Sequence, residues 1–166
     1  MNTAGTLDSW LGGLCAMRSL MLTLFAAALV MAAPSGVDIY SAKELQAMGQ
    51  QLAQKRTQFA SQNLVRYGNH YTMLAYREAT GSSEVHEHEA DIFVVESGEA
   101  TIVTGGKVVN PQTQKPGEIR GTSIEGGDRH PLAAGDIIHI PAGTPHQLLI
   151  ENGRPFTYFV VKVTGQ

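Results

Sequence analysis

The pattern of hydrophobic and polar positions has a helical period near residue 45 and a period of two beyond residue 64. Ser41 and Glu44 fit a capping box, in which each side chain binds the backbone N–H of the other residue. Hydrophobic residues then follow at helical spacing, namely Leu45, Met48, Leu52 and Phe59. This part of the pattern predicts one amphipathic helix from Ala42 to Ala60.

Short runs of alternating hydrophobic and polar residues make up most of the chain beyond residue 64. Alternation around Tyr71, Met73 and Ala75 predicts a first strand, and Gly, Pro and Asn residues separate the runs that come later. The later strand candidates are Ile92–Glu96, Ala100–Thr104, Asp136–Ile140, Gln147–Ile150 and Phe156–Val163. Together they predict an all-β domain, either an antiparallel barrel or a sandwich.

The stretch between Gly105 and Gly127 is polar and rich in glycine, and it contains Pro111 and Pro116. It is too long for a hairpin loop in a compact domain. We therefore expect an excursion of the chain over one mouth of the barrel.

An apolar run from Leu20 to Val30 precedes the small-residue segment around Ala33, as in a secretory signal. The run is shorter than the roughly 20 residues that span a bilayer, so we expect no membrane anchor after cleavage. Residues 1–16 contain no Lys or Arg, which favours Met17 as the true start. We expect a signal peptide at 1–33, a helical segment at 34–66 and a barrel at 67–166, in a secreted protein that is periplasmic or extracellular.

Length and charge narrow the choice of partners. The chain has 166 residues, enough for one ordinary domain, with 12 Lys and Arg against 15 Asp and Glu. Because it has no run of basic residues, we do not expect nucleic acid as a partner. The only cysteine, Cys15, lies in the segment expected to be removed, so a metal in the mature chain would be held by nitrogen and oxygen.

Three histidines form a spaced pattern that is typical of a metal site. His86 and His88 are two residues apart, which places both rings on one face of an extended chain. His146 follows a predicted strand and a Pro/Gly turn about sixty residues later. A ligand pair on one strand and a single ligand on a distant strand predict a mononuclear site with open coordination positions.

These two segments resemble the signature motifs of the cupin superfamily. The second motif is matched by Gly135, Pro141, Gly143 and His146, and the first by His86, His88 and Gly98. The resemblance covers about residues 67–163 and is to small secreted bacterial single-domain (type-2) cupins. It implies an all-β cupin jelly-roll β-barrel, here with an N-terminal helix.

The resemblance also implies an acidic ligand, normally Glu, and Asp91 stands in its place. The implied metal set is therefore His86, His88, Asp91 and His146, with Glu89 as the alternative to Asp91. The cofactor would be one divalent transition metal, and these ligands do not choose among Fe, Mn, Zn, Ni and Cu.

Two classes of function follow from such a site. The first is an enzyme of the dioxygenase, isomerase or lyase type that acts on a small oxygen-rich molecule, and the second is a non-catalytic barrel that binds a metal or small ligand. A structural barrel with an empty site is a third reading. His130 and His139 are either acid/base groups or structural residues. Exposed sheet edges, together with the resemblance, favour a homodimer.

Overall fold

The computed structural model of the protein describes residues 36–151 and 153–166. The expectations for a signal peptide at 1–33, a start at Met17 and a role of Cys15 lie outside these residues. No helix in the described part of the chain is long and apolar enough to cross a membrane. The fold reported below is that of the unit formed by residues 39–166.

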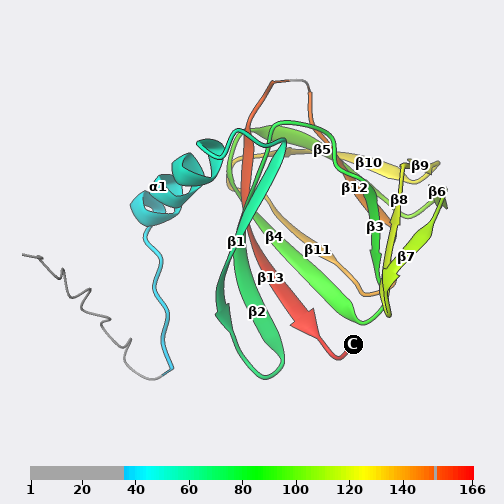
Figure 1. The fold of residues 1–166 in the computed structure, drawn as a ribbon, viewed down its shortest axis with the longest axis horizontal. Helices are drawn as coiled ribbons and strands as arrows, with labels where there is room; N and C mark the ends of the chain where they lie inside the picture. Colours follow the sequence, from blue (N-terminus) through cyan, green and yellow to red (C-terminus); the bar gives the residue numbers. More distant parts are fainter. Residues whose placement is uncertain (1–35, 152) are drawn as a thin grey trace, which may run out of the picture. The chain divides into compact units, whose positions relative to one another are not determined.

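Two antiparallel sheets make up most of this unit (Figure 1). The five-stranded sheet has the order β1 (Phe59–Arg66), β2 (His70–Arg77), β13 (Phe156–Thr164), β4 (Glu89–Ser97) and β11 (Ile137–Ile140). The six-stranded sheet has the order β10 (Asp128–Ala133), β5 (Glu99–Thr104), β12 (His146–Leu149), β3 (Ser83–His86), β8 (Glu118–Gly121) and β7 (Gln112–Lys115). A short ribbon pairs β6 (Lys107–Val109) with β9 (Ser123–Glu125).

The apolar core lies between the two large sheets, because alternate residues of each strand point inward. The five-stranded sheet contributes Phe93 and Val160, and the six-stranded sheet contributes Ile102 and Leu148. The sheets are not closed into one continuous hydrogen-bonded barrel. The expected all-β architecture is confirmed, and each of the later strand candidates overlaps an observed strand.

Helix α1 (Ala42–Ala53) covers the outer face of the five-stranded sheet. The expected capping box is present: the Ser41 hydroxyl accepts from the Glu44 N–H, and Glu44 accepts from the Ser41 N–H at 2.8 Å. Leu52 packs with the outward-facing Leu74 of β2. The helix therefore closes a second, smaller apolar layer outside the barrel.

The helix is shorter than the sequence predicted, because it ends at Ala53 rather than at Ala60. Arg56 has a φ of 51°, a left-handed conformation in which a right-handed helix cannot continue. Phe59 belongs to β1, where the Arg77 guanidinium lies 4.3 Å from the centre of its ring. The helical spacing between Leu52 and Phe59 therefore does not reflect a continuous helix.

The stretch from Gly105 to Gly127 is not a free excursion over a mouth of the barrel. It folds into β6, β7, β8 and β9, and β8 pairs with β3 while β7 pairs with β8. Pro111 and Pro116 fall just outside β7, where a missing backbone N–H does not interrupt the ladder. This polar segment therefore extends the six-stranded sheet and places β8 beside β3, the strand that carries His86.

Candidate metal centre

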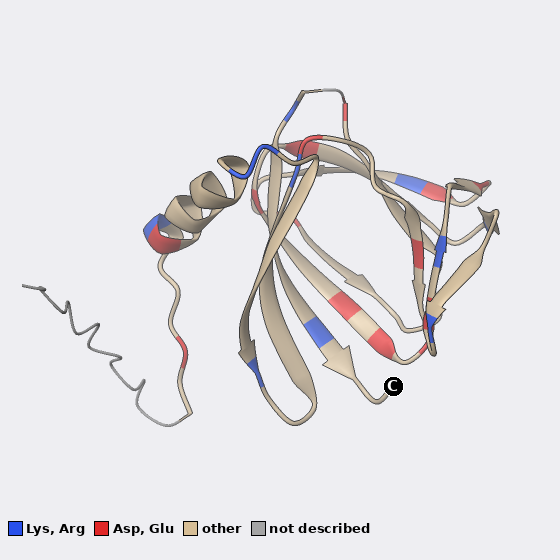
Figure 2. Ribbon diagram, in the orientation of Figure 1, with Lys and Arg blue, Asp and Glu red and all other residues tan. Residues whose placement is uncertain are grey.

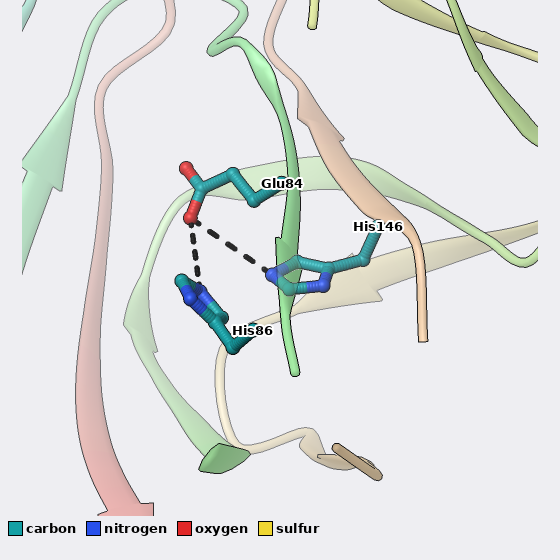
Figure 3. Close-up of side chains that lie close together, drawn as sticks. All are labelled: Glu84, His86 and His146. Carbon is teal, nitrogen blue, oxygen red and sulfur yellow. Dashed lines mark ion pairs between the residues drawn. The ribbon is translucent and has the colours of Figure 1, made fainter. Parts of the chain in front are cut away.

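Three side chains from two neighbouring strands gather at one point in the barrel (Figure 3). Glu84 and His86 lie two residues apart on β3, so their side chains point to the same face of the sheet. His146, the first residue of β12, pairs directly with Glu84 across the ladder. One ligand atom from each of the three residues lies within 4.8 Å of the other two.

The three side chains are buried and converge through particular atoms. Glu84 Oε2 lies 3.3 Å from His86 Nε2 and 4.0 Å from His146 Nε2, the two contacts that Figure 3 marks. The centres of the two imidazole rings are 5.3 Å apart. Each histidine is only 4% exposed. Two ring nitrogens and one carboxylate oxygen thus face a common point that water reaches poorly.

Hydrogen bonds at the far side of each ring fix the orientation of both histidines. His86 Nδ1 donates to Glu118 Oε2 at 2.8 Å, and His146 Nδ1 donates to the Thr144 carbonyl at 3.0 Å. A neutral imidazole that donates from Nδ1 has its lone pair on Nε2. In their neutral form, both histidines therefore present the lone pair of Nε2 toward Glu84.

These two Nε2 atoms are the strongest sign of a metal site. Among the described residues, both are buried and neither has a hydrogen-bond partner. Buried polar atoms without a partner are rare, because each carries an uncompensated cost of desolvation. Imidazole nitrogens with a carboxylate suit a divalent transition metal, and oriented histidines of this kind are typical of metal ligands. The residues present fit such an ion.

Two arginines hold the carboxylates beside the histidines. Glu84 Oε1 pairs with Arg77 at 3.3 Å and also with Arg120, which in turn contacts Glu118. Burial by itself would raise the pKa of Glu84, but the close contact with His86 and the nearby positive charges outweigh it and lower the pKa to about 2. Glu84 is therefore ionised, with Oε1 anchored and Oε2 facing the histidines.

Asp91 on β4 borders the same two nitrogens. Its Oδ2 atom lies 3.5 Å from His86 Nε2 and 3.6 Å from His146 Nε2. The residue is 2% exposed, and Lys162 Nζ contacts its two carboxylate oxygens at 2.7 and 3.0 Å. Asp91 is thus a fourth oxygen donor beside the group, with its charge balanced by a buried lysine.

Burial affects the two histidines differently. It lowers the pKa of His146, which favours the neutral ring that a metal ligand requires. Burial acts in the same direction on His86, but the close contact with Glu84 and the charges of Asp91 and Glu118 raise its pKa overall. The acidic surroundings of His86 therefore attract a positive charge, either a proton or a metal ion.

The structure brings together three of the four ligands that the sequence suggested, namely His86, Asp91 and His146. His88 instead lies exposed in the turn after β3, against Gly117, where an added Cβ would be 3.1 Å from His88 Cδ2. Because β3 ends at His86, the two-residue alternation does not extend to His88. The group contains Glu84 in addition.

The remaining candidates lie outside the group. Glu89, the alternative to Asp91, is on β4 and accepts a hydrogen bond of 3.4 Å from the Tyr71 hydroxyl. His130 and His139 are exposed on β10 and β11. Among the described residues, these three therefore take no part in the cluster around His86.

Sequence reasoning missed two residues of the site. Glu84 had a usable signal, because Glu84 and His86 have the same two-residue spacing as His86 and His88. Glu118 had none, since it comes from the polar stretch that was expected to leave the barrel. Its position depends on the pairing of β8 with β3, where Glu118 lies opposite His86.

The candidate metal centre opens on a cavity of about 400 Å³. Its walls come from β1, β2, β4 and β13 on one side and from β3, β7 and β8 on the other. This volume lies in the range of clefts that hold small molecules. Glu84, His86 and Asp91 all line it, so a small ligand could reach the centre.

Comparison with solved structures identifies the fold. No family model and no curated protein matches the chain. Among solved structures, a protein of Klebsiella pneumoniae with a double-stranded β-helix domain is 20% identical, with a TM-score of 0.53, over 79% of this chain and 93% of that one. The protein BH2720 of Bacillus halodurans is 18% identical, with a TM-score of 0.54, over 80% of this chain and 84% of that one.

Two further matches are more distant. The cupin domain of Cnp3 from Schizosaccharomyces pombe is 8% identical, with a TM-score of 0.50, over 65% of this chain and 66% of that one. The DMSP lyase DddQ from Ruegeria pomeroyi is 22% identical, with a TM-score of 0.47, and the chain spans only 49% of its length. The likenesses to the Klebsiella pneumoniae, Bacillus halodurans and Schizosaccharomyces pombe proteins show the fold alone, a double-stranded β-helix of the kind found in cupin domains.

Proposed function

We propose that the protein binds one divalent transition metal ion, either Fe, Mn, Zn, Ni or Cu, and acts through it on a small oxygen-rich molecule. The reaction would be of the dioxygenase, isomerase or lyase type. The observation that carries the proposal is the pair of buried Nε2 atoms of His86 and His146, which have no partner among the described residues and face the ionised Glu84.

In this proposal Glu84, His86 and His146 are the protein ligands. Asp91 is the fourth donor, because its carboxylate lies within 3.6 Å of both Nε2 atoms. Glu84 takes the position that the sequence resemblance suggested for His88. Three or four protein ligands leave coordination positions for a small molecule.

The ion, when bound, would supply a Lewis acid with open positions. The residues of the chain would orient the small molecule and control its protons. Tyr71 lines the cavity, and burial together with the charge and hydrogen bond of Glu89 raises its pKa to about 12. Its hydroxyl therefore stays protonated at neutral pH; the single hydrogen is donated to Glu89, and the oxygen can accept a hydrogen bond from a hydroxyl of the bound molecule.

The alternative is a barrel that binds a metal or small ligand without turnover. It is favoured by the pairing of the carboxylates, because Glu84, Asp91 and Glu118 each contact a cationic side chain. Among the described residues that line the cavity, Glu89 alone is an acid without such a pair, so few groups remain to act as a general base.

The deciding experiment compares metal content in three forms of the purified protein. The parent protein should retain close to one equivalent of metal after reconstitution, and the His86→Ala/His146→Ala variant should retain none. The matched control is His130→Ala/His139→Ala, which removes two exposed histidines from outside the centre and should bind metal as the parent does. A His88→Ala variant should also bind normally.

Two results would reject the proposal. One is a parent protein that stays empty after separate reconstitution with Fe, Mn, Zn, Ni and Cu. The other is metal that survives in the His86→Ala/His146→Ala variant. If the parent binds metal but converts no member of a panel of small acids, phenols and sugar derivatives, the non-catalytic alternative is the better description.

We also propose that the protein is exported and forms a homodimer. Export rests on the apolar run Leu20–Val30, and cleavage near Ala33 would appear in the intact mass of the mature protein. The homodimer is supported by Ile137, which is 70% exposed on β11 at the edge of the five-stranded sheet. Light scattering at monomer mass would contradict it.

A further inference from the structure

The cavity beside the metal centre contains more basic than acidic side chains. Five basic residues line it, Arg66, Arg77, Lys115, Arg120 and Lys162, against four acidic residues, Glu84, Glu89, Asp91 and Glu118. A divalent ion would add two further positive charges. The cavity therefore has an excess of positive charge that its own acids do not balance.

This excess is carried by two particular side chains. Arg77, Arg120 and Lys162 are each in an ion pair with a carboxylate of the cavity. Arg66 and Lys115 are in no ion pair within the described residues, and both are exposed. They stand on opposite walls, since Arg66 belongs to β1 and Lys115 to β7.

Arg66 is nevertheless held in place. Its guanidinium carbon lies 4.1 Å from the centre of the Tyr71 ring, and the Tyr71 hydroxyl donates to Glu89 at 3.4 Å. A guanidinium stacked on an aromatic ring keeps its N–H groups free at the edge. The fork of Arg66 is thus oriented but has no carboxylate to bind.

A row of inward-facing residues connects Arg66 to the metal centre. Arg66 pairs with Tyr71, Tyr71 with Lys162, and Lys162 with Asp91, across the four adjacent strands β1, β2, β13 and β4. Adjacent strands are about 4.8 Å apart, so the backbone positions of Arg66 and Asp91 are separated by about 14 Å. Figure 2 shows the basic end of β1 and the neighbouring basic and acidic bands of β13 and β4.

We propose that the small molecule bound in this cavity is an organic acid whose carboxylate binds Arg66, while Lys115 adds positive charge from the facing wall. The rest of the molecule would lie along the row and place its oxygen atoms at the metal centre. A planar carboxylate matches the two parallel N–H groups of a guanidinium, and Lys115 supplies a second positive charge from the facing sheet. This inference rests on the proposed function, because the far end of the molecule is assumed to reach the metal.

The test compares acids with their uncharged amides. Calorimetric titration of the metal-loaded protein would use 2-hydroxy acids, dicarboxylic acids and hydroxybenzoates, each beside its amide, with inorganic phosphate as a further probe. At least one acid should bind ten times or more tightly than its amide. Arg66→Gln should abolish this difference, Lys115→Gln should reduce it, and Arg66→Lys should restore only part of it.

Two matched controls separate a binding site from general attraction. Arg129→Gln and Lys107→Gln each remove an exposed cation from β10 or β6, outside the lining of the cavity. Both should leave the preference for acids unchanged. An equal loss in Arg129→Gln and Arg66→Gln would mean that net charge, rather than the row, attracts the acids, and would overturn the inference.

The remaining outcomes distinguish this inference from the metal proposal. If the parent protein holds metal but binds every acid no better than its amide, the inference is wrong and the metal centre stands. If phosphate binds in an Arg66-dependent manner while the acids do not, the assigned ligand class is wrong. A parent protein that holds no metal would instead reject the proposed function, and metal content is measured separately in every variant.

Discussion

The apolar core and the charged cavity are built from the same strands, yet they are stabilised in different ways. Strand β4 gives Phe93 and Val95 to the core and Glu89 and Asp91 to the cavity, all on the inward-facing side. In the core, burial of each side chain is favourable by itself. In the cavity, burial is tolerable only where each charge has a partner.

The border between the two regions lies at one aromatic side chain. The Phe93 ring is 4.9 Å from the Tyr158 ring and 6.4 Å from the His146 ring. Beyond it, the two Nε2 atoms of the histidines have no partner among the described residues. The side chains of the apolar core are therefore packed against one another, whereas the cavity contains polar atoms that a bound ion or small molecule could contact.

The largest effect is expected from breaking the buried ion pair of the cavity. In Lys162→Met the carboxylate of Asp91 loses its partner, and the free energy of unfolding of the metal-free protein should fall by about 3–5 kcal/mol. Urea denaturation measures this. The double variant Lys162→Met/Asp91→Leu should recover most of the loss, and an equally unstable double variant would contradict the explanation.

Truncation of a core side chain should lower the free energy of unfolding somewhat less than the loss of the buried ion pair. Ile102 is fully buried on β5, and Ile102→Ala should lower the free energy of unfolding by about 2–5 kcal/mol, because a cavity replaces well-packed methyl groups. Ile39→Ala is the matched control, since Ile39 is 81% exposed and its loss should change stability by no more than about 0.5 kcal/mol. Similar losses in both would show that Ile102 is not in a packed core.

Metal bound in the cavity should raise the free energy of unfolding without changing the packing of the apolar core. At a free metal concentration 100 times the Kd, the free energy of unfolding should rise by about 2.7 kcal/mol. The shift in thermal unfolding on adding the bound metal measures this. It should vanish in His86→Ala/His146→Ala and persist in Ile102→Ala. A shift that is equal in both variants would indicate binding elsewhere on the chain.

The smallest effect concerns the group that orients His86. In Glu118→Gln the side chain can still accept the hydrogen bond from Nδ1 but loses its charge, so metal affinity should fall by about 10- to 100-fold. Competition with a chelator of known affinity measures the change. Glu125→Gln, an exposed acid on β9, should have no effect. An unchanged affinity in Glu118→Gln would mean that Glu118 is structural.

The comparison also explains how much the sequence could predict. Alternation identified the strands, because a strand repeats every two residues whatever its partners are, but it did not say which face is inside. The Gly135–His146 motif likewise indicated the fold and the position of His146, one residue of the candidate site. These features are local, and the structure confirms the fold.

Features that depend on pairing between distant segments were not accessible. Because β3 ends at His86, Glu84 rather than His88 shares a face with His86. No residue near position 87 is of a type that would predict the end of the strand. The partner of His86, Glu118, is set by the register of β8 against β3. The overlong helix had another cause, since the left-handed turn at Arg56 has no Gly or Asn to reveal it.

The sequence distance between the paired groups has a consequence for the order of folding. Lys162 and Asp91 are 71 residues apart, and His86 and Glu118 are 32 residues apart. Closing such loops costs chain entropy before any contact stabilises them, so we expect these pairs to form late. The unfolded chain holds no preformed set of ligands for an ion. We therefore expect loading to follow folding, at a rate limited by access through the cavity rather than by collapse of the chain.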